Sequence, residues 1–225
     1  MTHRSRILMS IGILTLLFAV PAVSRADSVL FSNFGAGFSY NTGIGNVVGF
    51  DNNFAQGDTF TPTAGADFSS LDIALSCFSA CPDNLSVSLD ANKGGTPGAA
   101  LESFSVSGAS LGVFGNNNPP LVLNSVLMPL LTAGTQYWIT VSSDPNDSIA
   151  WNLNSTGDTS SEANSTDGGT TWFAPSGLTP GAYQVNGTTL VSPVPELSTL
   201  SLMLLALGLV LVMRKSTAQG LRQAR

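Results

Sequence analysis

Short runs of alternating apolar and polar residues constrain the fold of this chain more than any other feature. A period of two places successive side chains on opposite faces of a strand, so such runs are typical of strands with one buried face. Clusters of Gly, Pro, Asn and Asp separate the runs, and no helical repeat occurs between residues 27 and 194. The pattern predicts an all-β protein, with a single jelly-roll-like β-sandwich domain over residues 27–190. The clearest runs are residues 71–75, 85–89, 137–141, 149–153 and 183–185.

The N-terminal residues have the features of a secretory signal peptide. Arg4 and Arg6 precede an uncharged apolar stretch over residues 7–20, and small residues stand at Ser24 and Ala26. We expect a signal peptide over residues 1–26, cleaved after Ala26, and therefore an exported protein. The alternative is an uncleaved membrane anchor, although the apolar stretch is short for a spanning helix.

A second apolar stretch lies near the C-terminus, and basic residues follow it. Residues 197–213 are Leu-rich and uncharged, and Arg214 and Lys215 come directly after them. This length and composition predict a transmembrane helix over residues 197–213, with the basic pair as a cytoplasmic stop. A short polar tail, residues 216–225, completes the chain. The plain interpretation is a single-pass anchor that holds an outside domain at the membrane.

The residues around that helix resemble a PEP-CTERM sorting signal, which consists of a short motif, a membrane helix and a basic cluster. Val194, Pro195 and Glu196 match the motif, whereas Leu197 stands where the second proline is usual. The resemblance covers residues 191–215 and implies a partner, an exosortase-like membrane protease that recognises and removes the tail. In that family such proteins belong to Gram-negative bacteria that make exopolysaccharide.

Three segments of the middle region resemble the choice-of-anchor R domain. They are Gln-Gly-Asp-Thr-Phe-Thr-Pro at residues 56–62, Gly-Gly-Thr-Pro-Gly at 94–98 and Leu-Thr-Ala-Gly-Thr-Gln-Tyr-Trp at 131–138. The resemblance implies an exported β domain that is held at the cell surface by one of several kinds of C-terminal anchor. It implies no catalytic residues.

Charge and histidine content exclude several classes of function. All of the 14 acidic residues but Glu196, and of the 8 basic residues only Lys93, lie in residues 27–193. Such an acidic surface repels phosphates, so we expect no nucleic-acid partner. The one histidine, His3, lies in the predicted signal peptide, which leaves the mature domain without Ser-His-Asp or Cys-His catalysis. The groups that remain are expected to titrate mostly at about pH 4, so we expect little functional titration between about pH 6 and 8.

The two cysteines, Cys77 and Cys81, are close in sequence. In an oxidising compartment such an isolated pair predicts a disulfide that closes a tight loop. A redox or metal-binding pair is the alternative, but it would favour the closer Cys-x-x-Cys spacing or further ligands.

Two short motifs are better explained as turns than as catalytic sites. Residues 108–112 fit Gly-x-Ser-x-Gly, but a nucleophile elbow needs a following helix and a histidine base. Residues 165–172 resemble the Asp-box of β-propeller proteins, in which Asp167 would accept backbone hydrogen bonds and Trp172 would pack beneath.

Binding sites are predicted less sharply. Asp144, Asn146 and Asp147 could supply oxygen ligands to Ca²⁺, but the same residue types favour an ordinary turn, and no other cofactor is expected. Exposed Trp138, Trp151 or Trp172 would favour sugar binding, whereas core packing is the alternative for each.

These observations predict an exported, non-enzymatic protein of the cell envelope or extracellular space, anchored at least transiently by its C-terminal helix. A structural or interaction role in the envelope or exopolysaccharide matrix is the leading hypothesis. A carbohydrate-binding module is the second. A polysaccharide hydrolase is the third, and it would need a cleft with two carboxylates about 5–10 Å apart.

Overall fold

The structure is a computed structural model that describes residues 24–50, 52–78, 81, 84–175, 177–191 and 202–209. Packing divides the chain into two units, of which Arg25–Leu190 is the larger. Residues 202–209, in the other unit, are helical. The sorting motif Val194–Leu197, the basic pair Arg214 and Lys215, and the rest of the helix predicted over residues 197–213 lie outside the described residues. Among the helices described, none has the length and apolar character needed to cross a membrane.

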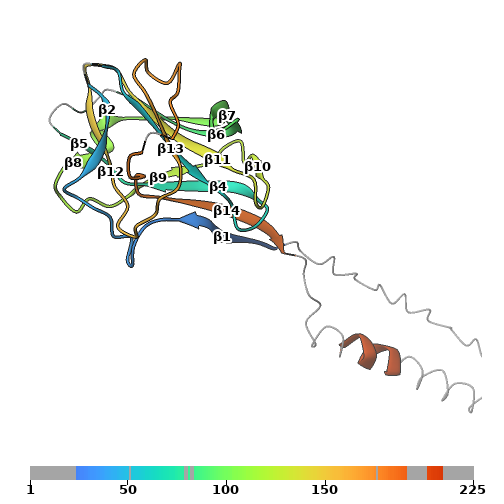
Figure 1. The fold of residues 1–225 in the computed structure, drawn as a ribbon. Helices are drawn as coiled ribbons and strands as arrows, with labels where there is room; N and C mark the ends of the chain where they lie inside the picture. Colours follow the sequence, from blue (N-terminus) through green and yellow to red (C-terminus); the bar gives the residue numbers. More distant parts are fainter. Residues whose placement is uncertain are drawn as a thin grey trace, which may run out of the picture. The chain divides into compact units, whose positions relative to one another are not determined.

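The larger unit is built from strands, which confirms the all-β prediction (Figure 1). One short 3-10 helix, η1 (Gly108–Ser110), interrupts them. The strands are β1 (Ser24–Ser32), β2 (Gly45–Gly49), β3 (Ala55–Phe60), β4 (Ala66–Ile73), β5 (Leu75–Cys77), β6 (Leu85–Lys93), β7 (Thr96–Val106), β8 (Gly112–Val113), β9 (Leu121–Asn124), β10 (Leu130–Leu131), β11 (Tyr137–Ser142), β12 (Ser148–Asn152), β13 (Glu162–Ser165) and β14 (Tyr183–Val191).

The strands form three sheets. The first has the order β1-β14-β4-β10, with β9 also pairing β4. The second has the order β13-β3-β11-β6-β7, and the third has the order β2-β12-β5-β8. Every pairing for which a register is described is antiparallel, apart from the short parallel pair of β5 and β8. Among the pairings whose register is described, the longest is that of β6 with β7 in the second sheet.

One apolar core joins the three sheets. Its members include Leu71 of the first sheet, Ile139 of the second and Trp151 of the third, all fully buried. On β11 the alternation places Ile139 in this core and the neighbouring Trp138 on the opposite face. Trp138 is nevertheless fully buried, and its indole N–H donates to Asn92 Oδ1 at 3.0 Å. Both faces of the second sheet are therefore covered around β11.

The first and last strands of the unit lie side by side, so its two ends leave at the same edge. Ser28 Oγ donates to the carbonyl of Gly187 at 3.2 Å, and Thr188 Oγ1 donates to Asp27 Oδ1 at 3.0 Å. These contacts place the start of β1 beside the end of β14 (Figure 1). Ala26, where signal cleavage is predicted, lies in β1.

Candidate functional site

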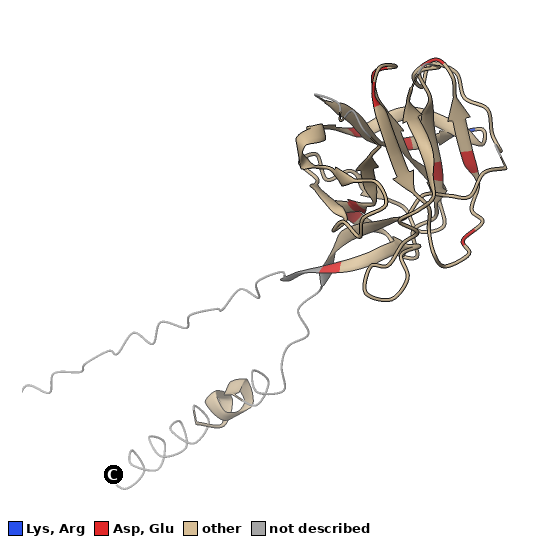
Figure 2. Ribbon diagram, turned by 90° about the vertical axis from the view of Figure 1, so that its left-hand side faces the viewer, with Lys and Arg blue, Asp and Glu red and all other residues tan. Residues whose placement is uncertain are grey.

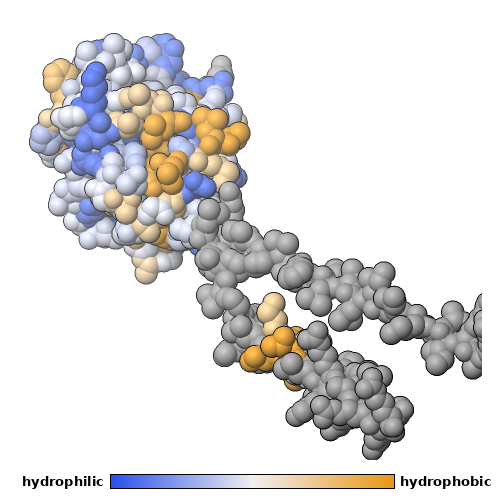
Figure 3. All heavy atoms as spheres, turned by 90° about the vertical axis from the view of Figure 1, so that its right-hand side faces the viewer, coloured by the Kyte–Doolittle hydropathy of each residue, from blue (hydrophilic) through white to orange (hydrophobic). Residues whose placement is uncertain are grey.

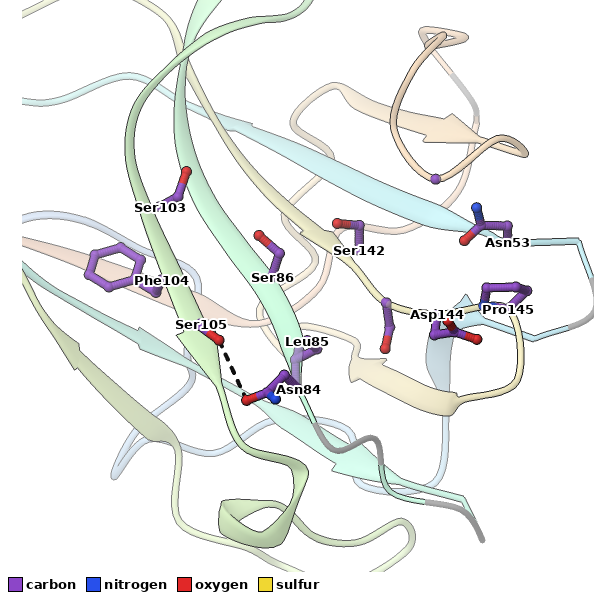
Figure 4. A pocket seen from close by; sticks show the side chains of 12 residues that line it. Asn53, Asn84, Leu85, Ser86, Ser103, Phe104, Ser105, Ser142, Asp144 and Pro145 are labelled. Carbon is purple, nitrogen blue, oxygen red and sulfur yellow. Dashed lines mark hydrogen bonds between the residues drawn. The ribbon is translucent and has the colours of Figure 1, made fainter.

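An open groove of about 640 Å³ lies over one end of the second sheet, and 7 of the 12 residues that line it are Asn or Ser (Figure 4). Three of its serines stand in one row across three strands, because Ser142 of β11 pairs with Ser86 of β6, which pairs with Ser105 of β7. Their side chains share the face of the sheet opposite the core, since Val141, Val87 and Val106 alternate with them and are buried. Loops add Asn53, Asn84, Ser143 and Asp144.

A second row of hydroxyls continues this surface along the strands. Thr140 of β11 pairs with Ser88 of β6, which pairs with Ser103 of β7. The Oγ atoms of Thr140 and Ser88 lie 2.7 Å apart, and each hydroxyl donates to the carboxyl group of Asp90 at 2.8 Å. Thr140 is buried, so the hydroxyls that could hydrogen-bond a sugar are the exposed ones of Ser86, Ser103 and Ser105.

The groove has few features of a hydrolytic site. Of the described residues that line it, Asp144 alone carries a carboxylate. A glycosidase needs a second carboxylate across the bond it cleaves. The Gly-x-Ser-x-Gly segment is not a nucleophile elbow, because it forms η1 and then strand β8, and Ser110 Oγ donates to the carbonyl of Ser107 at 2.6 Å.

The structure brings the predicted calcium ligands Asp144, Asn146 and Asp147 together in one turn. Asp144 Oδ1 accepts the backbone N–H of Asn146 at 3.0 Å and its side-chain amide at 2.7 Å. Asp147 Oδ2 accepts the backbone N–H of Asp144 at 3.1 Å and the hydroxyl of Ser143. The carboxylate oxygens thus accept hydrogen bonds from donors within the turn. This is the ordinary turn that the sequence analysis gave as the alternative to a calcium site. No three His, Cys, Asp or Glu residues in the described part of the chain are placed to hold a metal.

The predicted disulfide is present. Cys77 ends β5, and its Cα atom is 5.4 Å from that of Cys81. The ring of Phe78 in the closed loop packs on Phe114 with their centroids 4.4 Å apart. The bridge closes this loop at the end of β5, and the contact between Phe78 and Phe114 holds the loop beside the turn that follows β8.

The Asp-box segment forms a tight turn after β13. Asp167 Oδ1 accepts the hydroxyl of Ser165 at 2.7 Å and the backbone N–H of Thr171 at 2.8 Å, and Oδ2 accepts the Thr171 hydroxyl at 2.6 Å. Gly168 and Gly169 have φ of 70° and 90°, which a turn of this shape requires. These bonds, that of the Thr171 side chain most of all, lower the pKa of Asp167 to about 2.

The tryptophans do not form a sugar-stacking platform in the described residues. Trp138 and Trp151 are fully buried, and Trp172 is half-buried beside Gly169. Core packing, the alternative that the sequence left open for each tryptophan, explains Trp138 and Trp151 fully.

Exposed apolar side chains gather instead around the connection between β9 and β10 (Figure 3). Val126, Leu127 and Leu130 are 85%, 67% and 68% exposed. Buried Glu102 holds this loop, because its carboxylate accepts the backbone N–H of Val126 at 2.6 Å and that of Leu127 at 3.1 Å. Leu130 pairs with Asp67 on one side of β4, and Thr188 of β14 pairs with the same Asp67 on the other. The apolar loop therefore lies near the edge where the chain leaves the unit.

Sequence reasoning missed the buried carboxyl groups, because alternation identifies the core from apolar residues and gives no signal for an acidic residue that is buried. Asp58, Asp90, Glu102 and Glu162 are each at most 5% exposed. Burial raises the pKa of Asp90, against the hydrogen bonds from Thr140 and Ser88. Burial raises the pKa of Asp58 well above its usual range, although the backbone N–H of Gly181 opposes this. Asp58 and Asp90 therefore depart from the pKa of about 4 that is expected for most of the carboxyl groups.

No protein-family model matches this chain, and a search of curated proteins finds no match either.

Proposed function

We propose that this chain is an exported, non-enzymatic protein of the cell envelope or exopolysaccharide matrix, with a domain of the choice-of-anchor R kind. Its C-terminal residues act as a PEP-CTERM-like sorting signal, which holds the jelly-roll-like β domain at the membrane until an exosortase-like protease removes the tail. The supporting observation is that both ends of Arg25–Leu190 leave at one edge, near the exposed apolar loop at Val126–Leu130. That edge would face the membrane, and the hydroxyl-lined groove would remain open to extracellular polymer.

The acidic surface agrees with this role. Acidic residues are spread over the unit, and Lys93 in the β6–β7 turn is the one basic side chain described there (Figure 2). High net charge of one sign keeps a protein soluble and discourages association with other acidic polymers, including nucleic acids.

Fractionation of cells that express altered chains tests this proposal. The full chain should be found in the envelope fraction, and a chain that stops at Pro193 should be found in the medium or periplasm. Replacing Arg214 and Lys215 with Glu should also reduce retention, because the positive stop is lost. Replacing Arg222 and Arg225 with Glu is the matched control, since it leaves the stop in place. Equal retention of the full and truncated chains in the cytoplasm would contradict the proposal.

The hydroxyl array favours a second candidate, a carbohydrate-binding surface. Replacing Ser86, Ser105 and Ser142 together with Ala removes one complete row from the groove. If the groove binds sugar, sedimentation with exopolysaccharide should fall sharply for this variant. Thr132→Ala, at an exposed hydroxyl outside the groove, should bind as the unaltered protein does. Unchanged sedimentation of the triple variant would reject the groove as a sugar site.

A further inference from the structure

The inner face of strands β3 and β13 carries polar side chains where the rest of the second sheet carries apolar ones. Gln56, Asp58 and Phe60 lie two residues apart on β3 and so share one face, and Phe60 belongs to the apolar core. Glu162 of β13 pairs directly with Asp58. Side chains at directly paired positions lie on the same side of a sheet. Gln56, Asp58 and Glu162, here called the interior oxygen cluster, therefore face the interior together.

Two oxygens of this cluster are buried without a hydrogen-bond donor. Asp58 Oδ2 accepts the backbone N–H of Gly181 at 2.7 Å, but Asp58 Oδ1 has no partner. Gln56 Nε2 donates to the carbonyl of Val47 at 3.0 Å, which fixes the amide group and leaves Gln56 Oε1 without a partner. Gln56 is 5% exposed and Asp58 is 1% exposed. Gln56 Oε1 can only accept, and Asp58 Oδ1 can only accept when the carboxyl group is ionised, so a donor or a cation is needed to satisfy both in the charged state.

The negative charge of the neighbouring carboxyl groups also favours the binding of a positive charge. The Glu162 side chain is 2% exposed and its charge acts on Asp58, as does that of the nearby Asp158. Like charges directly opposite on neighbouring strands destabilise a sheet, and burial increases the cost. Among the described side chains of the unit, the one basic group is Lys93, which is exposed in the β6–β7 turn. No described basic side chain therefore neutralises the charge on Asp58.

We propose that the interior oxygen cluster of Gln56, Asp58 and Glu162 binds a divalent cation, and that Ca²⁺ is the ion it fits best. All of the donors are oxygens, from two carboxylates and one amide, and hard cations prefer such ligands. Ca²⁺ accepts protein oxygens in flexible geometry, whereas Mg²⁺ keeps several waters, which a buried site accommodates poorly. The bound ion would fix β13 to β3, and neither the sorting signal nor the surface groove is needed for this inference.

Thermal unfolding of the full chain in mild detergent tests the proposal. After EDTA treatment and removal of the chelator, added CaCl₂ should raise the melting temperature in a concentration-dependent way, because an ion that binds the folded state alone stabilises it. Asp58→Asn and Glu162→Gln should each weaken Ca²⁺ binding more than about 100-fold, since loss of even a supporting residue at a metal site typically costs about 10–100-fold. In both variants the shift should be lost.

Two matched variants separate this site from others. Asp90→Asn alters another buried carboxyl group, whose two oxygens already accept hydrogen bonds from Ser88 and Thr140. Asp144→Asn alters the surface turn. Both variants should keep the Ca²⁺-dependent shift. Loss of the shift in either one would overturn the assignment.

A measurement on the unaltered chain keeps the test decisive if Asp58→Asn or Glu162→Gln fails to fold. Tb³⁺ replaces Ca²⁺ at oxygen sites and is excited through nearby aromatic rings. Tyr183 is close to the cluster, because the charge of Asp58 acts on the Tyr183 hydroxyl. The centroid of the Tyr183 ring is 5.7 Å from that of the Trp151 ring. Sensitised Tb³⁺ emission that Ca²⁺ displaces, and that survives in Asp144→Asn, would support the site. Absence of both the emission and the thermal shift would overturn it, and would mean that a proton neutralises the cluster.

Discussion

At the scale of single residues, the carboxyl groups of this protein show two opposite effects of environment. Asp167 is exposed, and its oxygens accept hydrogen bonds from Ser165 and Thr171, which favour the charged form. Asp90 is buried, and removal from water favours its neutral form in spite of two hydroxyl donors. The pKa of an aspartate side chain is therefore lowered at Asp167 and raised at Asp90.

Asp167 should titrate with a midpoint near pH 2 in the folded protein. Because its pKa is lowered on folding, its contribution to stability is present above the unfolded-state pKa of about 4 and is lost as the pH falls through the folded pKa. Thr171→Val removes the largest cause and should move the midpoint up, whereas Thr166→Val, at a neighbouring exposed threonine, should not. An NMR titration of the side-chain carboxyl carbon measures the midpoint. A value near 4 in the unaltered protein would contradict this account.

At the scale of elements, the runs of clearest alternation in the sequence correspond to strands of the structure. The runs at residues 85–89 and 137–141 fall in β6 and β11, and the run at 149–153 overlaps β12 except for Leu153. The Gly- and Asn-rich stretch over residues 33–54 contains one described strand, the edge strand β2. The division into three sheets could not be predicted, because it depends on pairings between distant segments, such as β3 with β13. The inward positions of Asp58 and Glu162 could not be predicted from the sequence either, since neither residue type favours burial.

The connection between β9 and β10 depends on Glu102. Glu102→Ala should lower the free energy of unfolding by about 2–3 kcal/mol, because it removes a charged acceptor and leaves two partly buried N–H groups without it. Glu102→Gln keeps an acceptor oxygen and should cost less. Urea unfolding measures both. A change below about 0.5 kcal/mol for the Ala variant, the size typical of an ordinary surface substitution, would show that the loop does not need this anchor.

The end of β2 depends on Gly49. Its φ is 77°, and a Cβ atom there would lie 2.7 Å from the carbonyl oxygen of Asp144 and 2.9 Å from that of Asp147. Gly49→Ala should therefore destabilise the fold by about 2 kcal/mol or more, from backbone strain and the clash together.

Gly94→Ala is the matched control for this site. Gly94 also has positive φ, 64°, but nothing lies within 4 Å of its added Cβ. Strain alone should then cost about 1 kcal/mol. Equal losses of stability in the two variants, measured by urea unfolding, would show that contact with the 143–147 turn is unimportant.

At the scale of the whole molecule, the proposed function concerns export and membrane anchoring rather than a catalysed reaction. A compact β unit covers residues 25–190, and its two ends leave together at the edge near the apolar loop. The segments that we propose direct export and membrane sorting lie before and after this unit in the sequence. The unit itself supplies a hydroxyl-lined groove with one carboxylate and a buried oxygen cluster.

The intact mass of the protein recovered from its native envelope and culture medium tests the central claim most directly. The account predicts a chain that begins at Asp27 and, after processing, ends near Pro195. A chain that begins at Asp27 and still ends at Arg225 would keep export and contradict removal of the tail, with Leu197 the first residue to examine. Recovery of the whole chain from Met1 in the cytoplasm would contradict the claim itself.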